Sequence, residues 1–183
     1  DLFDQQLTRI EAEFGDFLMR LNWVSLGGGI HFTGEGYPLE RLAARLKAFQ
    51  ARFGVQVFLE PGEAAITGAA SLEVTVLDIL NNGKDLAIID SSVEAHMLDL
   101  LIYRQSARMQ TSGPHPYMIC GKSCLAGDIF GEFSFPQPLA VGDRLSIADA
   151  AGYTMVKKNW FNGVRMPAIV LKERDGSLTV ARS

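Results

Sequence analysis

Residues 1–62 alternate between helical and strand-like patterns of apolar side chains. Apolar residues recur at steps of three and four on one face of a predicted amphipathic helix that begins near Asp1 or Asp4: Leu7, Ile10, Phe14 and Leu18. Two short apolar runs, over residues 22–26 and 55–59, end at glycine or proline and indicate buried strands. A second helix is predicted over residues 38–53, between them. Helices and strands that alternate with short connections indicate an α/β layer with parallel strands.

The pattern changes after Gly62, where most apolar runs become short and strand-like. The predicted strands are Ala64–Thr67, Leu72–Leu80, Leu86–Asp90, Tyr117–Cys120, Arg144–Ala148 and Met166–Leu171. A last strand is expected after the turn at Glu173–Gly176, and one short helix around Val93–Tyr103. Strands that follow an α/β segment favour a second, all-β domain. We therefore expect one domain over residues 1–66 and another over residues 67–183.

Composition narrows the class of protein. The chain has 183 residues, of which 48% are hydrophobic and 21% charged, as in globular proteins. A net charge of −4 gives no basic surface for nucleic acid or an anionic membrane, and no apolar run approaches the length of a membrane-spanning helix. Residues 1–20 do not have the pattern of a secretory signal. Two cysteines in such a chain predict a reduced, cytoplasmic protein with no metal site.

Two segments at the ends of the predicted strands suit the binding of a charged ligand. Gly27, Gly28 and Gly29 follow the first strand, and consecutive glycines let backbone N–H groups approach an anion closely. A plain tight turn is the alternative. Glu60 follows the second strand, within Leu-Glu-Pro-Gly-Glu, and the C-terminal ends of strands carry the catalytic groups of β/α barrels. A surface turn acid is the alternative for Glu60.

Two further segments lie in the predicted β domain. Cys120 and Cys124 flank Gly-Lys-Ser, and a cysteine on such a loop is accessible, with a lysine nearby that favours the thiolate. A buried structural thiol is the alternative, which we favour for Cys120 but not for Cys124. Tyr153 lies on a predicted loop in Ala-Gly-Tyr-Thr, where its hydroxyl could donate to a phosphate. A half-buried core tyrosine is the alternative.

The order of these segments is more specific than any one of them. The chain contains, in this order, the segments GGG, EPGE, CGKSCLAGD and GYT…FNG. This series resembles the C-terminal half of the fold-type III pyridoxal-phosphate decarboxylases, the group of ornithine and diaminopimelate decarboxylases. The resemblance extends from Trp23 to Val180. Within the group, Leu59–Ala64, Ser123–Asp128 and Gly152–Val156 with Phe161–Gly163 look most like the branch that decarboxylates carboxynorspermidine and carboxyspermidine. The resemblance implies part of a (β/α)8 barrel followed by a C-terminal β-barrel or sandwich domain.

The resemblance also implies a role for each site residue. Gly27–Gly29 and Tyr153 would bind the phosphate of pyridoxal 5'-phosphate, and Glu60 would bond its pyridine nitrogen. Cys124 would protonate the substrate carbon in the other subunit of a homodimer, while Asp128 would hold the amine end of the polyamine substrate. From the residues alone, His96 and Asp99 could line the substrate pocket, although His96 could also be a polar residue on a helix face.

Two departures from the group and one missing element qualify this interpretation. Glu63 stands where the wider group has a phosphate-binding arginine, so it could attract the cationic substrate instead, and Leu125 replaces an acid that often follows the cysteine. No lysine here matches the one that forms the Schiff base, so we expect a fragment whose N-terminal half carries it. A decarboxylase of another basic or diamino acid, such as ornithine or diaminopimelate, and an inactive regulatory subunit remain alternatives.

Overall fold

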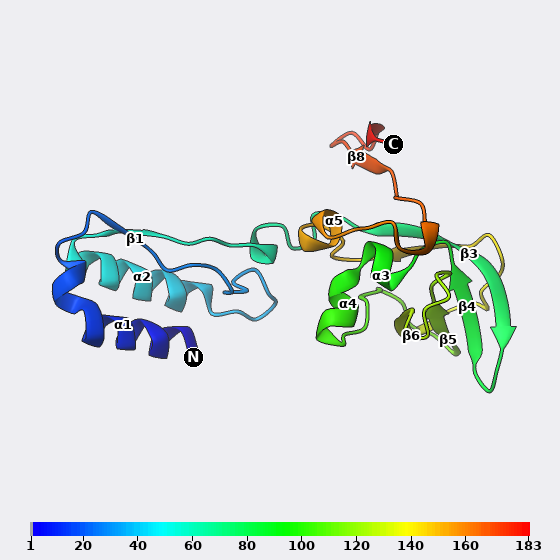
Figure 1. Ribbon diagram of the computed structural model, residues 1–183, viewed down its shortest axis with the longest axis horizontal. Coiled ribbons are helices and arrows are strands. Elements are labelled where there is room, and N and C mark those ends of the chain that lie inside the picture. Colours follow the sequence, from blue (N-terminus) through cyan, green and yellow to red (C-terminus); the bar gives the residue numbers. More distant parts are fainter. Residues whose placement is uncertain (1) are drawn as a thin grey trace. The chain divides into compact units, whose positions relative to one another are not determined.

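The structure is a computed structural model that describes residues 2–183 (Figure 1). The chain forms two compact units, residues 1–67 and residues 68–183, and each is described by itself. Asp1 lies outside the described residues, so the predicted helix start at Asp1 does too. None of the helices in the described part of the chain is long and apolar enough to cross a membrane.

The first unit is a small α/β layer. Its elements are α1 (Leu2–Leu18), β1 (Trp23–Ser25), α2 (Leu39–Phe53), β2 (Gln56–Phe58) and the 3-10 helix η1 (Glu63–Ala65). β1 and β2 pair in parallel, with Val24 opposite Val57, which confirms the predicted parallel α/β arrangement. Both helices lie on one face of this strand pair (Figure 1). Gly54 ends α2 in the left-handed conformation, as the sequence predicts.

The core of the first unit forms where α1 and α2 meet the strand pair. Its fully buried members are Leu7, Leu18, Phe49, Phe53 and Val55. Phe14, predicted on the buried face of α1, is instead 51% exposed, so that part of the prediction is wrong. α2 packs over the side of α1 that carries Gly15, and Arg45 of α2 binds Glu11 there at 2.8 Å, which leaves Phe14 at the uncovered edge.

The second unit is built on a five-stranded sheet of mixed direction, in the order β6-β5-β4-β3-β7. These strands are β3 (Leu72–Asn81), β4 (Asp85–Ile89), β5 (His115–Cys120), β6 (Ile129–Phe135) and β7 (Arg144–Ile147). Two short helices, α3 (Val93–His96) and α4 (Leu98–Tyr103), connect β4 to β5, and because they cross over, these two strands are parallel. All other neighbours in the sheet are antiparallel.

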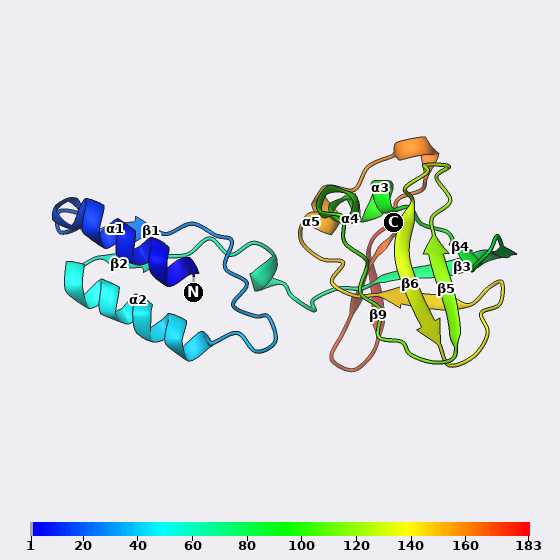
Figure 2. The ribbon, with the colours of Figure 1, turned by 90° about the horizontal axis from the view of Figure 1, so that it is seen from below.

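The sheet curls because β3 pairs with different neighbours along its length. Residues 72–75 pair with β7, residues 76–81 pair with β4, and the register shifts between Val76 and Asp78. Figure 2 shows β7 and β3 running across the direction of β5 and β6. The inner side of the curl holds a core in which Val74, Val76, Ile89, Ile119 and Phe130 are almost completely buried.

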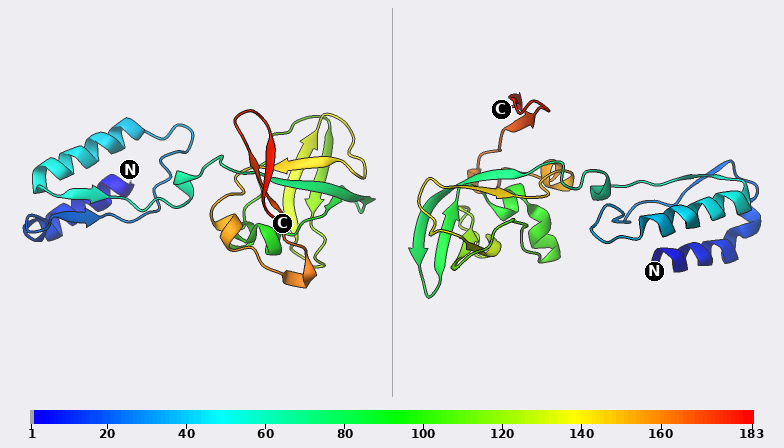
Figure 3. Two further views of the ribbon diagram at one scale, coloured as in Figure 1. Left: turned by 90° about the horizontal axis from the view of Figure 1, so that it is seen from above. Right: turned by 180° about the vertical axis from the view of Figure 1, so that it is seen from behind.

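The last elements follow the sheet. They are α5 (Tyr153–Val156), the 3-10 helix η2 (Phe161–Gly163), and the antiparallel hairpin of β8 (Ile169–Lys172) and β9 (Leu178–Arg182) (Figure 3). α5 replaces the loop predicted at Tyr153.

Other differences from the predicted elements have local causes. Ala64–Thr67 is not a strand, because the N–H groups of Ala65 and Ile66 bond back to the carbonyls of Gly62 and Glu63 and close a 3-10 turn. The helix predicted around Val93–Tyr103 breaks at Met97 into α3 and α4. β6 was not predicted, since Gly131 interrupts its pattern of apolar residues.

Candidate functional site

The glycine loop and the acid after β2 lie directly against each other in the first unit. The parallel pairing of β1 and β2 continues beyond the strands, where the N–H of Glu60 donates to the carbonyl of Gly27 at 2.8 Å. A Cβ on Gly28 would collide with the Glu60 carbonyl oxygen, so only glycine fits there. Gly27 and Gly29 have φ of +73° and +82° and face open space. The loop therefore presents its backbone without side chains in the way.

A serine links the Glu60 carboxylate to this loop. Ser25, the last residue of β1, donates its hydroxyl to Oε1 of Glu60 at 2.5 Å and accepts the N–H of Gly27 at 3.2 Å. These two bonds orient the carboxylate beside the glycine backbone. The result is a glycine loop with an open backbone and a carboxylate beside it, at the C-terminal ends of parallel strands, where β/α enzymes place their chemistry. Sequence reasoning missed Ser25, which lies two residues before the glycines and whose partner Glu60 is 35 residues away.

Glu63 lies three residues beyond Glu60, at the start of η1, with its side chain partly exposed. Its backbone carbonyl accepts the hydroxyl of Thr67 at 3.1 Å, and Thr67 also bonds the hydroxyl of Thr33 at 2.7 Å. Thr33 follows the glycine loop, so η1 is attached to the segment between β1 and α2. The predicted residues Gly27–Gly29, Glu60 and Glu63 thus belong to one connected region.

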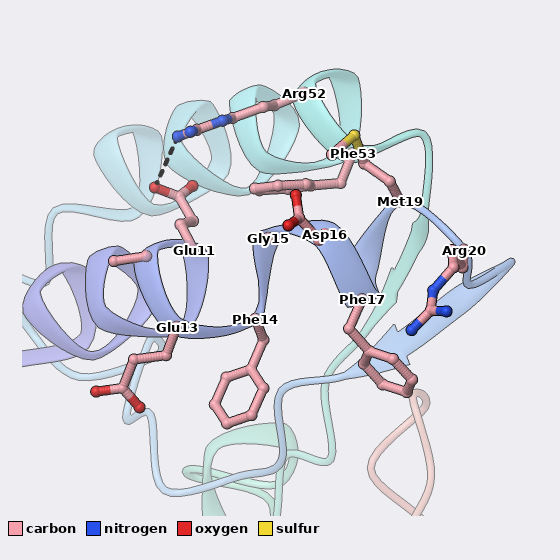
Figure 4. A pocket seen from close by; sticks show the side chains of 11 residues that line it. Glu11, Glu13, Phe14, Gly15, Asp16, Phe17, Met19, Arg20, Arg52 and Phe53 are labelled. Carbon is pink, nitrogen blue, oxygen red and sulfur yellow. Dashed lines mark hydrogen bonds and ion pairs between the residues drawn. The ribbon is translucent and has the colours of Figure 1, made fainter.

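An open pocket of about 470 Å³ occurs elsewhere in the first unit, between the C-terminal parts of α1 and α2 (Figure 4). Arg52 reaches Glu11 across it at 3.4 Å, and Phe14 and Phe17 point away from α2. Both helices end here and the strands begin, so the pocket lies at the N-terminal ends of β1 and β2. In β/α barrels this end serves stability and not catalysis, so we do not assign the pocket to the site.

The cysteine loop of the second unit joins β5 to β6. Cys124 is exposed and adopts a left-handed backbone with φ of +66°. Behind it, Asp128 is only 4% exposed and accepts the N–H of Val93 at 2.7 Å, the N–H of Ser123 at 3.0 Å and the Ser123 hydroxyl. Gly121 is needed because a Cβ there would collide with the same carboxylate. Asp128 therefore fixes the loop to the start of α3.

The loop is also held from the segment after α5. The side-chain amide of Asn162 donates to the backbone carbonyl of Ser123 at 2.5 Å, across 39 residues of chain. Ser123 and Asn162 were quoted in the sequence motifs but given no role. Cys120 differs from Cys124: it is partly buried in β5, and burial raises the pKa of its thiol, with the Asp128 carboxylate adding to the effect. A raised pKa keeps Cys120 in the unreactive thiol form.

Tyr153 and Asp99 meet at a lysine that sequence reasoning did not select. Lys157 donates to Oδ1 of Asp99 at 2.6 Å, and its ammonium lies 4.4 Å from the centre of the Tyr153 ring. The hydrogen bond that Lys157 donates to Asp99 raises the pKa of Lys157. Tyr153 itself is 48% exposed. The ion pair of Asp99 and Lys157, which joins α4 to the end of α5, therefore orients the Tyr153 ring.

His96 lies inside the second unit and is 4% exposed. Its Nδ1 is 2.8 Å from the hydroxyl of Ser91, whose backbone carbonyl accepts the N–H of Lys122 from the cysteine loop. Burial lowers the pKa of His96, which favours the neutral ring. His96 is thus neither a polar residue on an exposed helix face nor open to solvent, and its contacts connect α3 with the cysteine loop.

Comparison with known proteins agrees with the class of protein that the sequence resembles, the pyridoxal-phosphate decarboxylases. Residues 53–151 match the family of the pyridoxal-dependent decarboxylases, C-terminal sheet domain. Because this match covers more than half of the chain, the chain belongs to that family. The fold is also found in a diaminopimelate decarboxylase crystal structure from M. jannaschii, at 20% identity and a TM-score of 0.78 over 99% of this chain and 44% of that one.

Two relatives are more similar. A carboxynorspermidine/carboxyspermidine decarboxylase of Herminiimonas arsenicoxydans is 60% identical over 98% of this chain and 50% of its own length. The crystal structure of the Campylobacter jejuni carboxynorspermidine decarboxylase, complexed with norspermidine, is 36% identical with a TM-score of 0.91 over 100% of this chain and 54% of that one. The chain thus spans about half the length of the curated relatives it matches.

Proposed function

We propose that the chain is part of a pyridoxal-phosphate-dependent enzyme that decarboxylates carboxynorspermidine or carboxyspermidine, forming norspermidine or spermidine. The single observation that carries this proposal is the 60% identity to an enzyme of that name over nearly the whole chain. The enzyme acts in the cytoplasm as a homodimer with shared active sites. The lysine that carries the cofactor comes from a segment other than residues 1–183.

The first unit suits the cofactor chemically. The glycine backbone at Gly27–Gly29 is open to an oxyanion, and Glu60 beside it supplies the carboxylate for a protonated ring nitrogen. When bound, pyridoxal phosphate supplies an electron sink for the carbon that loses CO₂. Glu60 would keep that ring nitrogen protonated, and the bond from Ser25 keeps Glu60 in place. Tyr153 would donate its hydroxyl to the phosphate, with Lys157 holding the tyrosine ring.

The remaining site residues act on the substrate. Cys124 donates its thiol proton to the carbon that CO₂ has left, in the active site of the other subunit. Glu63 contributes negative charge for a substrate that carries several ammonium groups. Asp99, whose carboxylate is paired with Lys157, and His96 support the pocket from within the second unit. Asp128 was predicted to bind the amine end of the substrate. Its buried carboxylate already accepts three hydrogen bonds, which supports an indirect role in holding the cysteine loop.

We also propose that residues 1–66 are the last part of a (β/α)8 barrel and residues 67–183 a β-barrel or sandwich domain. A parallel strand pair is normally covered on both faces, whereas β1 and β2 are covered by helices on one face only. Trp23 and Phe58 lie on the uncovered side, in edge contact at 6.0 Å, and are 60% and 46% exposed. Further strands of a barrel would bury these two rings.

An assay of the full-length protein with carboxynorspermidine, carboxyspermidine, ornithine and diaminopimelate tests the function. We expect the highest kcat/KM with one of the two carboxylated triamines. A higher value with ornithine or diaminopimelate would contradict the assignment of substrate. The absence of any pyridoxal absorbance band in the purified protein would instead favour an inactive regulatory subunit.

Replacement of the two cysteines tests the proton donor. Cys124→Ala should lower kcat by about 10²–10⁴, the usual contribution of a positioned acid. It should also raise the share of misprotonated or transaminated product, because the carbanion persists longer. Cys120→Ala is the matched control and should change little, since Cys120 is partly buried with a raised pKa. Equal activity in both variants would identify two structural thiols.

A further inference from the structure

The backbone of Cys124 needs support from outside its own residue. Its φ of +66° lies in the left-handed region, which a residue with a side chain adopts only where surrounding contacts determine it. Cys124 itself is exposed, so its own burial does not supply this support. The contacts must therefore act on the peptide groups next to it.

All three polar groups of Ser123, directly before Cys124, are held. On the inner side, Asp128 accepts the N–H and the hydroxyl of Ser123. On the other side, the carbonyl of Ser123 accepts the side-chain amide of Asn162 at 2.5 Å. This carbonyl belongs to the peptide group that joins Ser123 to Cys124. Together, the two contacts fix the plane of that peptide and hence the direction in which the Cys124 side chain leaves the backbone.

Asn162 is itself held in place. It has φ of +49°, a conformation that asparagine tolerates better than most residues, within the 3-10 helix Phe161–Gly163. Before it, Asn159 donates its side-chain amide to the carbonyl of Glu94 at 2.9 Å. After it, Val164 is 3% exposed and anchors the segment in the unit. The amide of Asn162 is therefore presented from a fixed backbone.

We propose that Asn162 is a positioning residue for Cys124, acting with Asp128 through the Ser123 peptide. It holds the thiol in the direction from which the proton is delivered, without touching substrate or cofactor itself. This inference rests on the proposed role of Cys124 as proton donor. Without Asn162, the loop samples other directions, so the proton arrives more slowly and more of the carbanion is protonated elsewhere.

Amide hydrogen exchange in the full-length protein tests the structural part. Asn162→Gly permits the left-handed backbone but removes the amide, and Asn162→Asp keeps the shape but cannot donate from its carboxylate. One hydrogen bond corresponds to about a three- to tenfold change in local opening. We expect that increase in exchange rate for the peptide over residues 121–128 in both variants, and no change in β3. Thr111→Val, which removes another side-chain bond to a backbone carbonyl, that of Ser134 at 2.9 Å, is the matched control and should leave residues 121–128 unchanged.

Product analysis tests the functional part. Asn162→Gly should lower kcat with little change in KM, and should raise the misprotonated or transaminated share toward that of Cys124→Ala. Two outcomes would overturn the inference: normal exchange and product ratio in both Asn162 variants, or an equal effect of Thr111→Val. If Cys124→Ala itself left rate and product ratio unchanged, the proposed function of Cys124 would fail instead. The faster exchange in the Asn162 variants would then remain as a purely structural result.

Discussion

At the scale of single residues, Glu63 stands at the position where the resemblance to the wider group of decarboxylases implies an arginine. The side chain is partly exposed at the start of η1, within the connected region of Gly27–Gly29 and Glu60. If Glu63 attracts the cationic triamine, Glu63→Gln should raise KM by up to about fivefold, the range of a partly exposed charge pair. Steady-state kinetics at constant, low ionic strength measure this change.

The reverse-charge variant completes this test. Glu63→Arg should tighten the binding of pyridoxal phosphate while it raises KM further, because it restores a cation where the wider group binds phosphate. Glu13→Gln on the exposed side of α1 is a control for a general change of charge, as Glu13 pairs with Arg9 in its own helix. If neither KM nor the affinity for the cofactor changes, Glu63 is a surface turn acid.

His96 predicts a dependence of stability on pH. Burial lowers its pKa below 6.5, an effect that Lys158 and Lys122 increase and that Asp90 and the backbone of Arg165 oppose. In the unfolded chain the histidine binds a proton near pH 6.5, whereas in the folded chain it binds one only at lower pH. The contribution to stability is therefore complete above pH 6.5 and decreases as the pH falls toward the folded-state pKa. Urea unfolding of the full-length protein at pH 7.5 and 5.5 should show this decrease.

A variant isolates the histidine from other groups. His96→Gln keeps a polar group beside Ser91 but does not titrate, so the loss of stability between pH 7.5 and 5.5 should become smaller. Asp4 and Asp175, whose pKa values are lowered by hydrogen bonds from Arg45 and Ser177, titrate below 3.8 and do not contribute in this range. An unchanged pH dependence in the variant would assign the effect to other groups.

The residues of the site differ in how far the sequence reveals them. The sequence selects Gly27–Gly29 and Glu60 by their places after predicted strands, and the structure brings them together. Ser25 and Asn162 could not be selected in this way. Their bonds to Glu60 and Ser123 cross 35 and 39 residues, and only the parallel pairing of β1 with β2 and the folding of η2 onto the loop create them.

At the scale of elements, the close approach of the glycine loop to β2 gives a prediction. A methyl group on Gly28 would meet the Glu60 carbonyl oxygen, so Gly28→Ala must separate the loop from the end of β2. Overpacking of this kind costs about 1–3 kcal/mol, or roughly tenfold or more in an equilibrium constant. We therefore expect Gly28→Ala to weaken the binding of pyridoxal phosphate by about tenfold or more, as measured by absorbance titration of the full-length protein.

Gly15 provides a matched glycine-to-alanine control in the same unit. It lies inside α1, and a Cβ there would be 3.6 Å from Phe53, an ordinary contact. Gly15→Ala should leave cofactor binding unchanged and stabilise the protein by about 0.5–1 kcal/mol, since alanine is the better helix former. Equal cofactor affinity in both variants would mean that the loop tolerates separation from Glu60.

The sequence predicts features of an element well where their cause lies within that element, and poorly where the cause lies in another element. The period of apolar residues and the Gly54 cap locate α2 well, because both signals lie within the helix. The period does not say which edge of an amphipathic face is covered, so Phe14 was misplaced. That depends on where α2 packs, and the Arg45–Glu11 ion pair fixes it from another element.

At the scale of the whole molecule, much apolar surface of the first unit stays uncovered. Phe14, Phe17, Met19, Trp23 and Phe58 are each 46–60% exposed. The unit has only two strands, paired with each other, so each strand also has an unpaired edge. Uncovered apolar rings and open strand edges are features that promote association with other chains. These exposed rings and edges also fit the finding that the chain spans about half the length of its relatives.

Residues 1–183 expressed alone should therefore aggregate or remain partly unfolded. They should bind pyridoxal phosphate weakly, without imine absorbance and without decarboxylation, because the lysine that carries the cofactor is proposed to lie in another segment. Coexpression with the remaining half of the full-length protein should restore solubility and activity, since strands that pair with β1 and β2 would bury Trp23 and Phe58. Light scattering, titration with pyridoxal phosphate and borohydride reduction followed by peptide mapping measure these properties. A soluble monomer with a reducible adduct at one specific lysine would contradict the prediction and make that lysine the centre of the mechanism.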